Sequence, residues 1–120
     1  MRGYCAANAA SSDTNRKALV SSCVDQYIKG NLLYDATNSA GGAGSGAGVF
    51  DGIDIDWEYP GVQGFGYNTV SASDGANYVL LLQEFRTQLD TYGSQVGRTF
   101  YLSQAVGICA PRVNDMKPMR

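Results

Sequence analysis

The stretch Asp51–Gly61, with the sequence DGIDIDWEYPG, holds four of the chain's eleven acidic residues within eight positions. Apolar and acidic residues alternate along it, with Ile53, Ile55 and Trp57 on one parity and Asp54, Asp56 and Glu58 on the other. The β-branched and aromatic residues, bounded by a Gly-rich segment and by a Pro-Gly pair, predict a β-strand over residues 49–59. Such an apolar strand is typical of a protein core, so the presence of acidic residues on it is unexpected.

Side chains alternate between the two faces of a strand, which places the three carboxylates on one face and the apolar residues on the other. Helices can cover the apolar face, whereas the acidic face needs a cavity. Successive carboxylates start from Cα atoms ~6.6 Å apart, and charges this close can keep one acid protonated near neutral pH. Cleavage of a glycosidic bond needs such a proton on the leaving oxygen and a second group that stabilises positive charge at the anomeric carbon.

Two alternatives, a calcium-binding loop and a solvated surface, explain the acidic face less well than a functional site does. An EF-hand loop that starts at Asp54 would need Gly where Tyr59 stands and Glu where Phe65 stands. A solvated surface would account for any single carboxylate, but three in succession opposite Ile, Ile and Trp are unexpected on a strand with both faces covered. The pattern therefore favours a functional site.

The segment before the strand predicts a helix followed by a flexible linker. Apolar residues recur at helical spacing over residues 13–29, with Ser12 or Asp13 as the N-cap and Gly30 as the C-terminal stop. Residues 31–48 are rich in Gly, Ala, Ser and Asn, which favours an irregular loop with at most a few regular residues around positions 32–34. The glycines of this segment match neither the dinucleotide-binding pattern nor the P-loop pattern. The segment also precedes a strand, whereas both nucleotide-binding loops follow one.

The segment after the strand predicts a second helix and a second strand. An apolar stripe covers residues 74–92, opened by Ser73 or Asp74 and closed by Gly93, and residues 99–108 are typical of a buried strand. Helix, strand, helix, strand is the order of a parallel α/β layer in which the second helix crosses over between two adjacent strands. The predicted fold class is therefore α/β.

Composition indicates one soluble globular domain, with 120 residues, 44% of them hydrophobic, and a net charge of -2. The chain has no excess of basic residues, so nucleic acid is not predicted as a partner. It has no apolar run of ~20 residues, so no membrane span is predicted, and its first twenty residues lack the apolar run of a signal peptide. The chain has no histidine, and Cys5, Cys23 and Cys109 show no CxxC spacing, so no metal site and no cofactor is predicted. Three cysteines allow at most one disulfide, and the sequence leaves its existence open.

The stretch Asp51–Gly61 resembles the DxxDxDxE signature of glycoside hydrolase family 18, the chitinases and their relatives. The segments KALVSSCVDQYIKGN and NYVLLLQEFRTQLDTYG resemble the flanking helices of bacterial secreted members, so the resemblance covers residues 17–93. It implies a secreted chitinase that hydrolyses β-1,4 linkages between N-acetylglucosamine units of chitin or chito-oligosaccharides. The implied mechanism is retaining and substrate-assisted.

The resemblance also implies a role for each residue of the motif. Glu58 would be the general acid that protonates the glycosidic oxygen and later activates water. Asp56 would orient the N-acetyl group of the substrate and stabilise the oxazolinium formed on it, and Asp54 would hold Asp56 or share its charge. Asp51, out of phase with the other three, would have a structural role at the strand entrance, and Tyr59 would line the sugar subsite or pack beside it.

Family 18 catalytic domains are (β/α)8 barrels, and such barrels typically need ~250 residues. The resemblance makes residues 49–59 strand four and residues 99–108 strand five, so residues 1–120 would be a partial catalytic domain from the helix before strand four through strand five. The family's SxGG strand, its N-acetyl-binding tyrosine and its aromatic floor have no counterpart here. We therefore expect activity from the full-length product and none from the 120 residues alone, whose strand edges would lack partners.

Two further functions stay open within the same resemblance. A chitinase-like lectin uses the barrel to hold a sugar without cutting it, although the presence of Glu58 counts against that class. An endo-β-N-acetylglucosaminidase that acts on N-glycans would use the same strand and mechanism. The sequence decides neither between these substrates nor between exo and endo cleavage.

Overall fold

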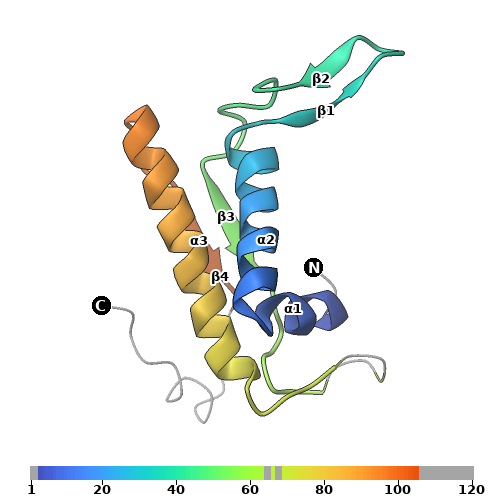
Figure 1. Cartoon of the computed structure of the whole chain (residues 1–120), viewed down its shortest axis with the longest axis vertical. Coiled ribbons are helices and arrows are strands. Elements are labelled where there is room, and N and C mark those ends of the chain that lie inside the picture. Colours follow the sequence, from blue (N-terminus) through green and yellow to red (C-terminus); the bar gives the residue numbers. More distant parts are fainter. Residues whose placement is uncertain (1–2, 64–65, 67–68, 106–120) are drawn as a thin grey trace.

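The computed structural model describes residues 3–63, 66 and 69–105. Its elements in chain order are α1 (Gly3–Ala10), α2 (Asp13–Cys23), the π-helical turn η1 (Val24–Ile28), β1 (Leu32–Asp35), β2 (Ala40–Gly42), β3 (Gly52–Ile55), α3 (Asp74–Val96) and β4 (Tyr101–Gln104). Figure 1 shows α2 and α3 side by side against the β3–β4 pair, with the β1–β2 hairpin extending away from this layer. The α/β fold class is confirmed.

β3 and β4 form a parallel two-stranded sheet, and α3 is the connection between them. The register runs from the pair Gly52–Tyr101 to the pair Ile55–Gln104, and the N–H of Ala105 continues it by donating to the carbonyl of Ile55 at 3.0 Å. Parallel strands need a crossover of a dozen or more residues, and α3 supplies it. The predicted crossover helix between adjacent parallel strands is therefore confirmed.

Both strands are shorter than the sequence predicts. The prediction of residues 49–59 is wrong at both ends, because only residues 52–55 find partners in β4. The second strand covers residues 101–104 of the predicted 99–108, and residues 106–108 lie outside the described residues. A strand exists only where a neighbour provides the ladder, so the extent of the apolar run overestimates its length. As a result, Asp56 and Glu58 follow the carboxyl end of β3.

α2 begins where the sequence predicts. Ser12 is the N-cap, and its Oγ accepts a hydrogen bond from the backbone N–H of Asn15 at 3.2 Å. The helix widens into the η1 turn before it ends, and Gly30 follows with a φ of 73°. A Cβ at Gly30 would lie 2.0 Å from the backbone nitrogen of Ala47, so this stop position has room for glycine alone.

α3 runs past its predicted end. The sequence predicts that Gly93 closes the helix, but the helix continues to Val96, and Gly97 forms the left-handed C-cap with a φ of 68°. Gly93 is instead buried in the helix, where a Cβ would lie 2.4 Å from the carbonyl oxygen of Arg98. This glycine therefore permits close packing of the returning chain and does not stop the helix.

The predicted loop over residues 31–48 holds an antiparallel hairpin of β1 and β2 in its first half. β1 lies where the sequence allows a few regular residues, whereas β2 and its pairing with β1 are not predicted. The carboxylate of Asp35 builds the turn by accepting hydrogen bonds from the side chain of Asn38 at 2.6 Å and from the backbone N–H groups of Thr37 and Asn38. These bonds, the Asn38 side chain first among them, hold the pKa of Asp35 below its ordinary value. α1 is a second element that the sequence does not predict.

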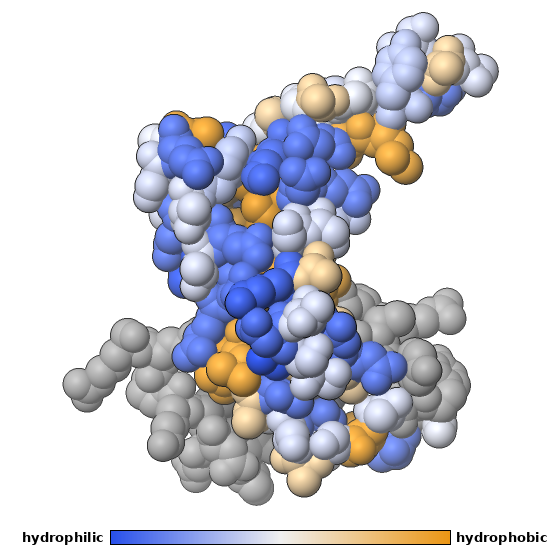
Figure 2. All heavy atoms as spheres, viewed as in Figure 1, coloured by the Kyte–Doolittle hydropathy of each residue, from blue (hydrophilic) through white to orange (hydrophobic). Residues whose placement is uncertain are grey.

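The core lies where α2, η1 and α3 meet each other and one face of the sheet. Its buried members include Val20, Val24, Ile28, Leu81, Leu82, Phe85, Leu89 and Phe100. Figure 2 shows mostly hydrophilic atoms over the helices, with exposed apolar atoms where the hairpin joins the layer. Among the described helices, none combines the length and apolar character needed to cross a membrane.

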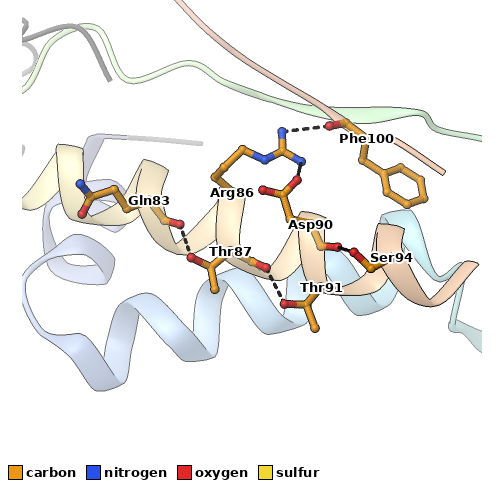
Figure 3. Close-up of polar contacts among 7 residues, drawn as sticks. All are labelled: Gln83, Arg86, Thr87, Asp90, Thr91, Ser94 and Phe100. Atoms are coloured by element: carbon orange, nitrogen blue, oxygen red, sulfur yellow. Dashed lines mark hydrogen bonds and ion pairs between the residues drawn. The ribbon is translucent and has the colours of Figure 1, made fainter. Parts of the chain in front are cut away.

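Phe100, the residue before β4, is docked on α3 from several sides. The guanidinium of Arg86 donates to the carbonyl oxygen of Phe100 at 2.9 Å and lies 2.7 Å from the carboxylate of Asp90. Figure 3 shows Arg86 between these two partners. The ring of Tyr92 stacks on the Phe100 ring, and the guanidinium of Arg98 lies 5.2 Å from the centre of that ring. These contacts fix the start of β4 on the helix that precedes it.

Arg86→Met should destabilise the fold by about 1–3 kcal/mol, because it leaves the Phe100 carbonyl without its charged donor while the apolar stem is kept. The unfolding midpoint of the full-length protein measures this. Lys17→Met is the matched control, since Lys17 forms an exposed ion pair with Asp13 at the same helical spacing, and we expect no change there. An Arg86→Met variant as stable as the control would show that the tether does not hold β4.

Candidate active site

The predicted segregation of acidic and apolar residues continues beyond the end of β3. Ile53 and Ile55 are half-buried, and Trp57 is 7% exposed. The three carboxylates between and after them are all exposed: Asp54, Asp56 and Glu58. The extended chain therefore keeps the alternation after the ladder stops. The acidic face itself is open in the described part of the chain, whereas the sequence predicts that it lines a cavity.

Asp54 is the acidic residue that lies within the sheet, and the register places Ser103 of β4 directly beside it. The hydroxyl of Ser103 donates a hydrogen bond to Oδ1 of Asp54 at 2.5 Å. A short bond to a carboxylate is among the stronger hydrogen bonds of proteins and fixes the direction of the acceptor. The sequence does not predict a role for Ser103. Whether Ser103 lies beside Asp54 depends on the register between the two strands, which the sequence of one strand does not reveal.

Glu58 and Tyr59 lie together, as predicted. The hydroxyl of Tyr59 donates to Oε1 of Glu58 at 3.1 Å, and the peptide bond between the two residues is cis. Glu58 is exposed, and Tyr59 is half-buried. This arrangement leaves the second oxygen of the Glu58 carboxyl for another partner, while contact of Tyr59 with a sugar stays a prediction.

Trp57 holds the motif against α3. Its ring meets the ring of Tyr78 edge to face, with centroids 5.4 Å apart and an interplanar angle of 75°. Tyr78 is 7% exposed, and its hydroxyl has no hydrogen-bond partner among the described residues. Burial first, and then the charges of Asp54 and Asp56, raise the pKa of Tyr78 to about 12. Tyr78 is therefore neutral at physiological pH, and the negative charges of Asp54 and Asp56 disfavour its ionisation.

Asp51 was predicted to anchor the strand entrance, and its backbone lies there. Its carbonyl oxygen accepts a hydrogen bond from the N–H of Tyr101 at 2.9 Å, which extends the β3–β4 pairing by one residue. The Asp51 side chain is exposed. The anchoring contact is thus made by the main chain, and a structural role for the carboxylate stays a prediction.

A cleft of about 540 Å³ is bounded by three parts of the structure: α2 together with η1, the apolar side of β3, and α3. Its lining is mainly apolar, and it reaches the acidic motif only at Asp54 and Asp56: Leu19, Cys23, Tyr27, Phe50, Gly52, Ile53, Asp54, Ile55, Asp56, Trp57, Leu81 and Phe85. Glu58 and Tyr59 do not line it. The cleft therefore lies mainly on the packing side of the sheet, and Glu58 lies outside it.

Cys23 carries a free thiol that is half-buried, and burial raises its pKa. Cys109 lies outside the described residues, as does the side chain of Cys5. Within the described part of the chain, no group of three or more His, Cys, Asp or Glu side chains is placed to hold a metal ion.

Comparison with known proteins gives consistent results. The family model described as glycosyl hydrolases family 18 matches residues 7–119. The catalytic domain of psychrophilic chitinase B from Arthrobacter TAD20 is 46% identical with a TM-score of 0.81, over 90% of this chain and 25% of that one. A family 18 N-acetylglucosaminidase from Paenibacillus barengoltzii is 31% identical with a TM-score of 0.65, over 91% of this chain and 26% of that one.

A chitinase of Autographa californica nuclear polyhedrosis virus is 45% identical over 58 residues, which are 48% of this chain and 10% of the viral protein. The chain thus spans about a quarter of the two solved structures, and its match spans a tenth of the viral chitinase.

Proposed function

Because the chain belongs to glycosyl hydrolase family 18, we propose that the full-length protein is a chitinase that hydrolyses β-1,4 linkages between N-acetylglucosamine units. The observation that carries this proposal is the position of Glu58, exposed just beyond the carboxyl end of β3 with Asp54 and Asp56 on the same face. The similarity to the chitinases named above supports chitin or chito-oligosaccharides as the substrate. We further propose an extracellular location.

The same proposal assigns residues 1–120 to one catalytic domain, as the part of a (β/α)8 barrel from the helix before strand four through strand five. In that arrangement β3 is strand four and β4 is strand five. The parallel pairing of β3 with β4 across α3 supports the assignment, because the barrel is built from such units. The exposed acidic face would then line the barrel interior of the full-length protein.

In the proposed mechanism, the carboxyl group of Glu58 gives its proton to the glycosidic oxygen as the bond to the anomeric carbon breaks. The carbonyl oxygen of the substrate's own N-acetyl group forms the new bond to that carbon, which gives an oxazolinium and makes a protein nucleophile unnecessary. The Glu58 carboxylate then takes a proton from water as the water opens the oxazolinium from the opposite face. The two displacements together retain the anomeric configuration.

The remaining residues orient these groups. Asp56 would accept a hydrogen bond from the N–H of the acetamido group and stabilise the positive charge of the oxazolinium. Asp54 would support Asp56, and the hydrogen bond from Ser103 gives Asp54 a defined orientation for this. The hydroxyl of Tyr59 donates to Glu58, which supports a place for Tyr59 beside the reacting oxygen.

A second candidate is an N-acetylglucosaminidase with the same mechanism, because a family 18 enzyme of that name shares this fold at 31% identity. Chromatography of the products from chitohexaose separates the two. A chitinase releases oligosaccharides from internal or terminal positions, whereas an N-acetylglucosaminidase releases the monosaccharide. A sugar-binding protein without activity would release nothing, and the presence of Glu58 argues against that alternative.

Glu58→Gln in the full-length protein should lower kcat for chito-oligosaccharides by several orders of magnitude, because it removes the general acid and the base together. Binding of the oligosaccharide, measured by calorimetry, should change little. Glu84→Gln is the matched control, since Glu84 lies on α3 and its carboxylate accepts from Gln88. Near-normal turnover by Glu58→Gln would show that the acid is another residue.

Asp56→Asn should lower kcat strongly, and an oligosaccharide without the acetyl group on the cleaved sugar should be a poor substrate for the unaltered enzyme. Both changes remove one interaction, that of Asp56 with the acetamido group, so their losses should overlap in a double cycle. The measurement is kcat/KM for the four combinations of enzyme and substrate. Independent, additive losses would contradict the substrate-assisted mechanism.

Ser103→Ala should lower kcat by about tenfold, because a hydrogen bond to a charged group contributes about 1.5–3 kcal/mol and its loss frees Asp54 to rotate. Ser103→Thr keeps the hydroxyl and should retain most of the activity. Ser94→Ala, which removes a hydroxyl that donates to a helix carbonyl on α3, serves as the control for loss of a serine. Equal activity of the alanine and threonine variants would exclude the role of the hydroxyl.

A further inference from the structure

The first two turns of α3 contact the chain on both sides of Glu58. Asp74 and Tyr78 lie four residues apart on this helix and therefore share one face. The Tyr78 ring packs against Trp57, the residue before Glu58. The carboxylate of Asp74 accepts a hydrogen bond from the N–H of Gly61, three residues after Glu58. Glu58 is thus held between two contacts that come from one rigid element.

Asp74 is the one charged side chain that is buried among the residues that the structure describes, with 2% of its surface exposed. Burial of a carboxylate is costly unless hydrogen bonds replace water. Its Oδ2 accepts two bonds, from the backbone N–H of Ser71 at 2.9 Å and from that of Gly61 at 3.3 Å. Its place at the first residue of α3 adds the favourable field of a helix N-terminus.

These bonds do not cap the helix in the usual way. Ser73 occupies the N-cap position and makes no side-chain cap bond, whereas the Asp74 side chain reaches back to the loop that precedes the helix. Gly61 belongs to a turn in which the N–H of Val62 donates to the carbonyl of Tyr59 at 3.1 Å. The carboxylate of Asp74 therefore ties this turn, which follows Glu58 directly, to the start of α3.

We propose that Asp74 is a positioning residue for the general acid: by fixing the turn at residues 59–62, it sets the direction in which the Glu58 carboxyl group meets the glycosidic oxygen. This inference rests on the proposed function. An acid must lie within hydrogen-bond reach of the oxygen that it protonates, and a displacement of about 1 Å can cost on the order of 100-fold in rate. Asp74 touches no reacting atom and acts through the main chain between Gly61 and Glu58.

The test compares Asp74→Ala and Asp74→Asn in the full-length enzyme on two substrates. Chitotetraose needs a proton on its leaving oxygen, whereas a 2,4-dinitrophenyl chitobioside has a leaving group that departs without one. Asp74→Ala should lower kcat on chitotetraose by about 100-fold and change KM by less than about threefold. On the dinitrophenyl substrate, kcat/KM should fall by less than about threefold, because it reports the steps up to departure of the leaving group, which needs no proton.

Asp74→Asn keeps one oxygen that can accept a hydrogen bond, so its loss on chitotetraose should be smaller, on the order of tenfold. Asp13→Asn is the matched control, because Asp13 is also the first residue of its helix but is exposed and pairs with Lys17. It removes an acidic residue from a helix N-terminus without touching the turn, and both rates should stay unchanged. This control separates the loss of a helix-terminal charge from the loss of the tether.

Three results would overturn the inference. Equal losses on both substrates would assign Asp74 a general structural role, and unchanged kcat in both variants would leave it no role in positioning. An unaltered enzyme that cleaves neither substrate would overturn the proposed function and, with it, this inference. Either of the first two results, obtained with an active unaltered enzyme, would overturn the inference alone.

Discussion

The parallel pairing of β3 with β4 is the constraint on which the described structure depends. Parallel neighbours cannot be joined by a tight turn, so the chain must travel back along the sheet before β4 can begin. α3 does this with 23 residues, a length of about 35 Å at 1.5 Å per residue. Its first turns contact the segment that follows β3, through Asp74 and Tyr78. Its later turns hold the start of β4, through the contacts of Arg86 and Tyr92 with Phe100.

Each contact of α3 with the sheet therefore also has a consequence for the acidic motif. Arg86 fixes the carbonyl of Phe100, and this docking sets where β4 starts and hence its register with β3. The register in turn places Ser103 beside Asp54. At the other end of the helix, Tyr78 packs on Trp57 immediately before Glu58. The same helix that completes the core thus determines the geometry of the residues proposed to carry out the reaction.

The sequence predicted the order of the main elements because these depend on local patterns: the N-cap at Ser12, the apolar stripe of α3 and the alternation around Asp54. It did not predict features that depend on contacts distant in sequence. Gly93 has the local pattern of a helix stop, but a carbonyl from the returning chain lies against it and the helix continues. The pairing of β1 with β2 is not predicted, because the side chain of Asp35 builds the turn within a segment whose composition is typical of a flexible loop.

The candidate site shows the same division between local pattern and tertiary contact. The face that carries Asp54, Asp56 and Glu58 follows from alternation alone, whereas Ser103 becomes visible only with the register of two strands. Asp74 was an N-cap candidate in the sequence, and nothing local distinguishes an aspartate that caps its own helix from one that reaches back to a preceding loop. The difference lies in burial: an exposed carboxylate keeps its water and stays available for chemistry, but a buried one must find donors in the protein. For Asp74 those donors are backbone N–H groups of the segment that follows Glu58. The hydrogen bonds that Asp74 needs because it is buried therefore also hold the turn that positions Glu58.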